Sequence, residues 1–244
     1  MLLLAIAVGT CGATLAGGLF ALHLKDRLCL VLGFSAGAVV AVAFFDLIPE
    51  ALALGQSERS PPTTLSLVAL GFLTYLVLDR LQMLRAAAER PPAISGEPNR
   101  KRGALGAASF SVHSFLDGIA IGVALQASAA VGTVVAVAVL AHDFSDGINT
   151  TSIVLNNGGS RRQAMRWLAV DAATPALGIA VTLLISVPAS TIGILLGLFA
   201  GFFLYVGASD LIPESHHAHP KFLTTVMTLL GAASLYVVVT LAGR

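Results

Sequence analysis

Residues 46–50, with the sequence Asp-Leu-Ile-Pro-Glu, end one long apolar stretch of the chain and recur unchanged as residues 210–214 at the end of another. Small and aromatic residues precede both copies. The first copy closes the second apolar stretch and the other closes the seventh, so the two run in opposite directions if every stretch crosses a membrane. A repeated element in opposite orientations is typical of transporters built from inverted repeats.

The composition indicates an integral membrane protein. Of 244 residues, 56% are hydrophobic and 11% are charged, and the mean hydropathy is +0.87. Soluble domains carry about 25% charged residues. About 20 apolar residues cross a bilayer, and the sequence predicts eight spans, near residues 2–22, 28–50, 63–84, 104–126, 130–156, 163–186, 190–213 and 221–242.

We therefore expect an all-α membrane protein with a single transmembrane domain over residues 1–244. The segment at about 85–103 contains three prolines and mixed charges, and we expect it to be a flexible cytoplasmic linker. The net charge of +1 favours no nucleic-acid partner. The lipid bilayer is the expected surrounding.

The positive charges predict the orientation. If the N-terminus lies outside, twelve of the fourteen Lys and Arg residues fall on the inner side, and only Arg59 and Arg244 fall on the outer side. Lys and Arg are enriched on the cytoplasmic side of membrane proteins. Both termini are therefore expected on the non-cytoplasmic side.

Ionisable residues concentrate in the fourth and fifth spans. Each span has a His, then an Asp four positions later and a Gly: His113 and Asp117 in one, His142 and Asp146 in the other. A charged side chain at the bilayer centre costs about 2.5–3.5 kcal/mol on insertion scales, and neither helix core contains a Lys or Arg. Positions i and i+4 share a helix face. Two facing helices would gather imidazoles and carboxylates that suit Zn, Fe, Mn, Co or Ni.

The same geometry predicts a neighbouring site with oxygen ligands only. On a helical projection Asp117 lies between its histidine and Ser114, and Asp146 lies between its histidine and Asp143. Each of the two carboxylates can therefore reach toward either side.

These residues carry a resemblance to a known family. Residues 113–122, His-Ser-Phe-Leu-Asp-Gly-Ile-Ala-Ile-Gly, resemble the fourth-helix signature of the ZIP (Zrt/Irt-like protein) family of divalent metal transporters. Residues 142–147 are similar to its fifth-helix signature, His-Glu-x-Pro-Glu-Gly, with Asp in place of both Glu and Ser in place of Pro. Residues 35–50 and 207–214 look like its second and seventh helices.

The resemblance implies a fold of eight transmembrane helices in which inverted three-helix repeats flank a central pair. It implies a homodimer in the plasma (inner) membrane that moves zinc, or Fe, Mn, Co or Cd, toward the cytoplasm. It also implies the ligands. The primary site would be His113, Asp117, His142 and Asp146, and the adjacent site would be Ser114, Asp117, Asp143 and Asp146.

The resemblance and the positions of the residues also indicate candidates outside these two sites. Asp46 would lie on the outer path, and the inner path would hold Asp210, Glu214, His216 and His217. Some family members have a Glu in the sixth span, and Asp171 lies one turn before the corresponding position. We expect Asp171 to take the place of that Glu.

The leading hypothesis is a secondary transporter without enzymatic activity, because the chain contains no ATP-binding motif. No cofactor is expected apart from the transported ion. Two alternatives stay open. One is an intramembrane zinc-dependent hydrolase, since His and Asp can hold a catalytic zinc. The other is a degenerate family member that binds metal as a sensor.

Overall fold

The computed structural model describes residues 1–21, 28–56, 58–88, 100–217 and 222–242. These residues are almost entirely helical, and eight of the helical segments are long and apolar enough to cross a membrane. Each predicted span corresponds to one of them, which confirms the eight-span fold. The elements are α1 (Leu2–Ala21), α2 (Leu28–Val42), η1 (Ala43–Leu47), α3 (Ile48–Gly55), α4 (Pro61–Ala88), α5 (Arg100–Ala127), α6 (Ala129–Asn156), α7 (Arg161–Thr182), α8 (Ala189–Tyr205), η2 (Val206–Leu211), α9 (Ile212–His217) and α10 (Phe222–Leu241).

Helices extend into both ends of the segment predicted to be a linker, at about 85–103. Helix α4 continues to Ala88 and α5 begins at Arg100, so helices occupy both ends of the predicted segment. The physical reason is that the prolines, which end helices, lie only between Pro91 and Pro98, whereas Arg and Ala on either side favour helix. Residues 89–99 lie outside the described part of the chain.

The second and seventh spans each contain a π-helical turn immediately before their shared Pro-Glu sequence. In η1 the backbone N–H of Ile48 donates to the carbonyl of Ala43, and in η2 that of Ile212 donates to the carbonyl of Gly207. The proline after each isoleucine has no N–H to donate. Such π-bulges occur frequently at functional sites, and here both place an aspartate, Asp46 or Asp210, inside the wide turn.

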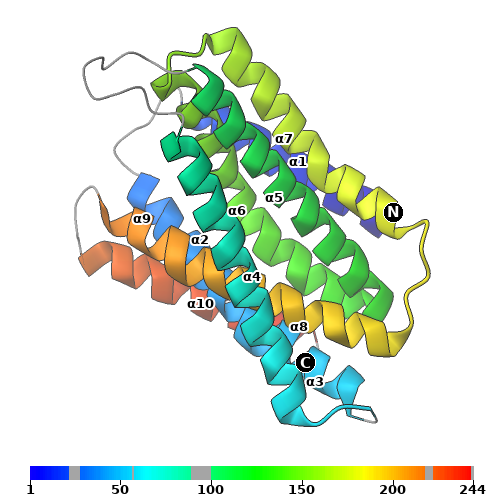
Figure 1. Cartoon of the computed structure of the whole chain (residues 1–244). Coiled ribbons are helices and arrows are strands. Elements are labelled where there is room, and N and C mark those ends of the chain that lie inside the picture. Colours follow the sequence, from blue (N-terminus) through cyan, green and yellow to red (C-terminus); the bar gives the residue numbers. More distant parts are fainter. Residues whose placement is uncertain (22–27, 57, 89–99, 218–221, 243–244) are drawn as a thin grey trace.

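The spans pack as two groups of helices. The four-helix bundle consists of α1, α5, α6 and α7, which contact one another extensively; the flanking bundle consists of α2, η1, α3, α4, α8, η2, α9 and α10. In Figure 1 the four-helix bundle lies toward the upper right and the flanking bundle toward the lower left. Apart from the central α5–α6 contact, the strongest helix pairings are α1 with α6, α5 with α7, α2 with α10 and α4 with α8, and each pair belongs to a single bundle.

Reciprocal glycine contacts hold these four pairings together. In each pair, both helices have a glycine on which a Cβ would come within 1.8–2.3 Å of a backbone carbonyl oxygen of the partner helix. The glycine pairs are Gly17 with Gly147, Gly118 with Gly178, Gly37 with Gly231 and Gly71 with Gly201. Small residues allow such close approach between helices in membranes.

The same contacts reveal the internal symmetry. One numerical offset relates Gly37 on α2 to Gly201 on α8, and it also relates Asp46 to Asp210. Likewise α1 corresponds to α7, α10 to α4, and the central α5 to α6, each with its own constant difference in residue number. Under these correspondences each of the eight glycine contacts of the four pairs maps onto another. The three-helix repeats, α1 to α4 and α7 to α10, therefore flank the α5–α6 pair as the resemblance implied.

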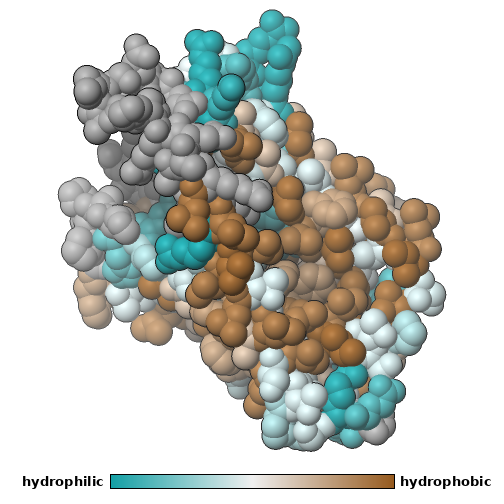
Figure 2. Space-filling model, in the orientation of Figure 1, coloured by the Kyte–Doolittle hydropathy of each residue, from teal (hydrophilic) through white to brown (hydrophobic). Residues whose placement is uncertain are grey.

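Polar contacts at the two ends of the molecule agree with alternating spans. Arg59, before α4, donates to the backbone carbonyl of Ser190 at the start of α8, and Arg100, at the start of α5, donates to that of Gly158 before α7. Figure 2 shows hydrophobic residues over the middle of the visible face and hydrophilic residues gathered toward its ends. This is the distribution expected of a protein that crosses a bilayer.

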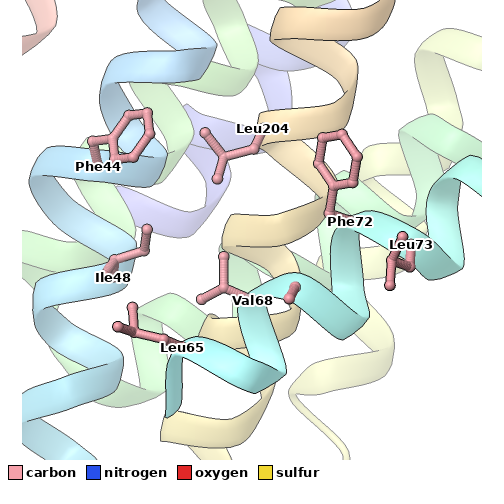
Figure 3. A pocket seen from close by; sticks show the side chains of 8 residues that line it. Phe44, Ile48, Leu65, Val68, Phe72, Leu73 and Leu204 are labelled. Atoms are coloured by element: carbon pink, nitrogen blue, oxygen red, sulfur yellow. The ribbon is translucent and has the colours of Figure 1, made fainter. Parts of the chain in front are cut away.

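The outer face of the flanking bundle has a shallow apolar pocket of about 440 Å³ between η1, α3, α4 and α8. Figure 3 shows its lining, which includes Phe44, Val68 and Leu204. All the lining side chains are hydrophobic, so the pocket offers no ligand to a metal ion. The polar residues predicted from the sequence lie elsewhere.

Candidate metal centre

The two His-Asp motifs meet between α5 and α6. The motif spacing of four places both side chains on one face of each helix. The helices are joined by a single residue, Ser128, whose side chain caps α6 by accepting from the N–H of Val131, and they run antiparallel in close contact. The short connection and the equal depth of the motifs bring all four side chains together.

The ligand atoms converge on one point. His113 Nε2 lies 3.3 Å from Asp117 Oδ2 and 3.9 Å from Asp146 Oδ2. His142 Nε2 lies 3.3 Å from Asp117 Oδ2 and 3.8 Å from Asp146 Oδ2. One ligand atom from each of the four residues lies within 4.8 Å of the others. In a tetrahedral zinc site with bonds of 2.0–2.1 Å, ligand atoms are separated by about 3.3 Å, so small side-chain shifts would complete the geometry.

The centre is shielded from the surroundings. The His142 side chain has no exposed surface, and those of Asp117 and Asp146 are 5% and 6% exposed. Asp146 Oδ2 has no hydrogen-bond partner within the described part of the chain. A buried carboxylate oxygen without a partner is costly, and a bound cation would remove that cost.

Hydrogen bonds orient both imidazoles. His142 Nδ1 lies 3.1 Å from the carbonyl oxygen of Ala138 on its own helix, and His113 Nδ1 lies 3.0 Å from the hydroxyl of Tyr75 on α4. A carbonyl only accepts, so His142 donates through Nδ1 and its neutral ring has a free lone pair on Nε2. Such outer contacts fix the ring orientation of metal-binding histidines.

Ser114 bonds to a carboxylate outside the four-residue cluster. Its hydroxyl donates to Asp171 Oδ1 on α7 at 2.8 Å, and Thr150 donates to Asp171 Oδ2 at 2.7 Å. Asp171 is fully buried. The structure thus brings Asp171 beside the α5–α6 pair. Thr174, one turn later on α7, donates its hydroxyl to the backbone carbonyl of Asp171.

Asp143 is the most unusual carboxylate of the region. It has no exposed surface, and neither of its oxygens has a hydrogen-bond partner among the described residues. It lies close enough to Asp117, Asp146 and Asp171 to interact with their charges. The helix that carries it, α6, runs unbroken through Ser145, the position where the family signature has proline.

The other candidate residues, Asp46, Asp210, Glu214, His216 and His217, lie on η1, η2 and α9 of the flanking bundle. Asp46 is fully buried in η1, whereas Asp210 in η2 is half-exposed and Glu214 is exposed. His216 contacts Ser215 and Thr225 near the ends of α9 and α10. His217 ends α9, and its side chain lies outside what the structure describes.

Sequence reasoning missed Tyr75. A single tyrosine in an apolar span is ordinarily read as an interfacial anchor, and only the contact with His113 reveals another role. It also missed that Tyr205 donates to Asp79 Oδ2 at 2.9 Å, between α8 and α4. No sequence pattern links these positions, which lie 126 residues apart.

Comparison with known proteins agrees with this site. Residues 95–239 match the family model of the ZIP zinc transporter. The chain is 24% identical over 219 residues to the zinc transporter ZupT of Corynebacterium aurimucosum, covering 83% of each protein. It is 30% identical over 133 residues to the human zinc transporter ZIP4, covering 52% of this chain and 21% of that protein. It is 34% identical over 107 residues to the zinc transporter zipt-7.1 of Caenorhabditis briggsae, covering 42% of this chain and 27% of that protein.

The fold and the buried His-Asp centre define a multi-pass membrane protein of the metal-transporting class. The matched region includes the centre and more than half of the chain. The chain belongs to the ZIP family. It spans most of the bacterial relative but only a fifth to about a quarter of the two animal relatives. Family membership and the buried centre both support divalent metal transport.

Proposed function

We propose that this protein is a secondary transporter that carries zinc, or a similar divalent ion, toward the cytoplasm. The ion would be held by His113, Asp117, His142 and Asp146. The observation that carries the proposal is the convergence of four buried ligand atoms within 4.8 Å of one another. Two imidazoles and two carboxylates suit Zn²⁺ and its neighbours in the first transition row.

Uptake into proteoliposomes tests the proposal. Purified wild type and Asp117→Ala are reconstituted at equal protein density, and radioactive zinc uptake is followed. We expect the variant to lose uptake, because a carboxylate shared by both histidines is removed. Glu58→Ala serves as the matched control, since Glu58 is an acidic residue with 55% side-chain exposure in the turn before α4. Equal uptake by Asp117→Ala and wild type would reject the assignment.

A second ion position beside the first is part of the proposal. Asp143 supports it, because its two buried oxygens have no partner among the described residues. Asp117 and Asp146 would be shared between the two positions, and Asp171 would close the far side. Ser114 is the remaining proposed ligand of this position, and its hydroxyl donates to Asp171. Cadmium bound per protein should fall from two to one in Asp143→Ala, and an unchanged count would remove the second position.

The hydrolase and the sensor remain the competing hypotheses. A catalytic zinc needs an open coordination position for water, whereas here four side chains are available to fill a tetrahedral shell. A sensor would bind metal without moving it across the membrane. Binding without flux in the proteoliposome assay would favour the sensor, and metal-dependent cleavage of a membrane peptide would favour the hydrolase.

Orientation, location and assembly are also proposals. The distribution of Lys and Arg supports both termini on the non-cytoplasmic side, and the resemblance supports a homodimer in the plasma (inner) membrane. A tag at each terminus of the protein in intact cells tests the orientation by its accessibility to protease. The mass of the detergent-solubilised protein, measured by light scattering, tests the dimer.

A further inference from the structure

The environment of His113 differs from that of its symmetry mate His142. Under the offset that relates α5 to α6, the two histidines correspond, and so do Asp117 and Asp146. His142 uses its Nδ1 on a carbonyl of its own helix. His113 uses its Nδ1 on Tyr75, which belongs to α4 and therefore to the flanking bundle. Of the two imidazoles, only that of His113 hydrogen-bonds to the flanking bundle within the described residues, whereas His142 meets that bundle through a ring contact with Phe203 at 6.0 Å.

The symmetry explains why the link is single. The position on α10 that corresponds to Tyr75 is Leu235, which is 2% exposed and has no group that could bond to an imidazole. The repeat therefore duplicates the backbone packing of α4 and α10 but places a hydroxyl on one side only.

Tyr75 is itself held firmly by the flanking bundle. Its ring centroid lies 5.2 Å from that of Tyr205 and 5.6 Å from that of Phe202, both on α8. Tyr205 in turn donates to Asp79, one turn after Tyr75 on α4. The ring of Tyr75 also meets the His113 ring edge to face, at 5.7 Å and 79°. These contacts restrict the tyrosine to the rotamer that reaches His113.

The two bundles meet mainly where α2 packs on α6 and α5 packs on α8, and the bond from Tyr75 crosses at a sparser place. Every glycine whose Cβ would collide with backbone of another helix, within the described residues, has its partner in the same bundle. Helices α4 and α5 have few contacts with each other. Other polar contacts cross elsewhere, between Ser35 of α2 and both Ala141 and Ser145 of α6. A hydrogen bond across a sparse contact has a large influence on the one side chain it reaches.

We propose that Tyr75 is a positioning residue that orients His113 for metal binding and does so from the opposite bundle. The inference rests on the proposed function of His113 as a ligand. When the Tyr75 hydroxyl accepts from Nδ1, the His113 ring presents its Nε2 lone pair to the ion. Metal affinity then depends on how the two bundles are placed, because a shift of α4 relative to α5 removes the acceptor.

The test measures zinc affinity and transport in Tyr75→Phe, which keeps the aromatic packing and removes only the hydroxyl. Loss of such an outer contact typically weakens metal binding by about 10–100-fold. We expect the Kd for zinc of the full-length protein in detergent to rise by about 10-fold or more. The KM of uptake should rise with it, while the maximal rate at saturating zinc changes less.

Tyr205→Phe is the matched control, because it removes a hydroxyl from the same aromatic cluster that bonds to Asp79 instead of His113. Its Kd should stay close to that of wild type. Equal weakening of zinc binding in Tyr75→Phe and Tyr205→Phe would show that the hydroxyls act through packing and would overturn the inference. A wild-type Kd for zinc in Tyr75→Phe would also overturn it. His113→Ala distinguishes failure of the proposed function from failure of the inference about Tyr75. If His113→Ala binds zinc normally, the proposed function fails. If His113→Ala loses zinc binding but Tyr75→Phe does not, only the role of Tyr75 fails.

Discussion

The two copies of Asp-Leu-Ile-Pro-Glu have the same backbone and different surroundings. Both begin in a π-helical turn, and Leu47 and Leu211 are buried to a similar degree. Their acids differ. Asp46 has no exposed surface, whereas Asp210 is half-exposed. Identical sequence and identical local conformation therefore do not fix the environment of the carboxylate, which depends on the helices packed against each copy.

The difference extends along the flanking helices. Helix α4 carries Tyr75 and Asp79, whereas the corresponding positions on α10 are Leu235 and Val239. Backbone packing is thus duplicated by the repeat, but the polar side chains of Tyr75 and Asp79 have no polar counterparts on α10. An inverted-repeat transporter gives its two halves different environments in any single conformation, and here the half with Asp210 is the more open.

The largest expected effect comes from removing the carboxylates that the two central helices contribute to the same centre. Asp117→Ala and Asp146→Ala should each reduce zinc uptake by more than about 100-fold, since removing even an outer contact costs about 10–100-fold. Initial rates in proteoliposomes measure this. Retained uptake in one of the two variants would mean that the halves do not share the ion.

The unequal openness of the repeats gives the next effect. In a background with Cys11→Ser and Cys29→Ser, a charged thiol reagent should modify Asp210→Cys about 10-fold faster than Asp46→Cys, because only an accessible thiolate reacts. The measurement is the time course of labelling in permeabilised membranes. Similar rates would contradict the comparison of the two copies.

Acid should affect both halves of the centre together. Protons compete with metal for the two imidazoles and the two carboxylates, so binding is strongest where the histidines are neutral and the aspartates ionised. Lowering the pH on both sides from about 7.5 to about 5.5 should reduce uptake by about threefold to tenfold. Uptake that rises in acid would contradict direct ligation by His113 and His142.

The smallest effect tests whether packing is truly duplicated. Gly37→Ala and Gly201→Ala should each lower the thermal midpoint by roughly 5–10 °C, because the new Cβ would lie 1.8 or 2.1 Å from a carbonyl oxygen of the neighbouring helix. Gly12→Ala is the control, since nothing lies within 4 Å of its Cβ position. A loss in only one of the first two variants would break the equivalence of the repeats.

Much of the fold could be read from the sequence, because a bilayer demands long apolar helices and the apolar stretches are easily counted. The contact between the two His-Asp motifs could also be predicted, because the spacing of four places each pair on one helix face. The short turn at Ser128 also leaves the two adjacent spans few relative arrangements. The boundaries of the linker were harder to predict. Ala86, Ala87 and Ala88 prolong α4 beyond the apolar span, where hydropathy gives no signal.

The sequence by itself determined eight spans, a repeated element and four candidate ligands on two neighbouring helices. These features depend on local periodicity and on the cost of burying charge, which act within a helix or between adjacent ones. Only the tertiary structure decided that Tyr75 hydrogen-bonds to His113, that Ser114 donates to Asp171, and that Asp210 is more exposed than Asp46. Those contacts join positions far apart in the chain, and their formation depends on which helices the glycines allow to approach.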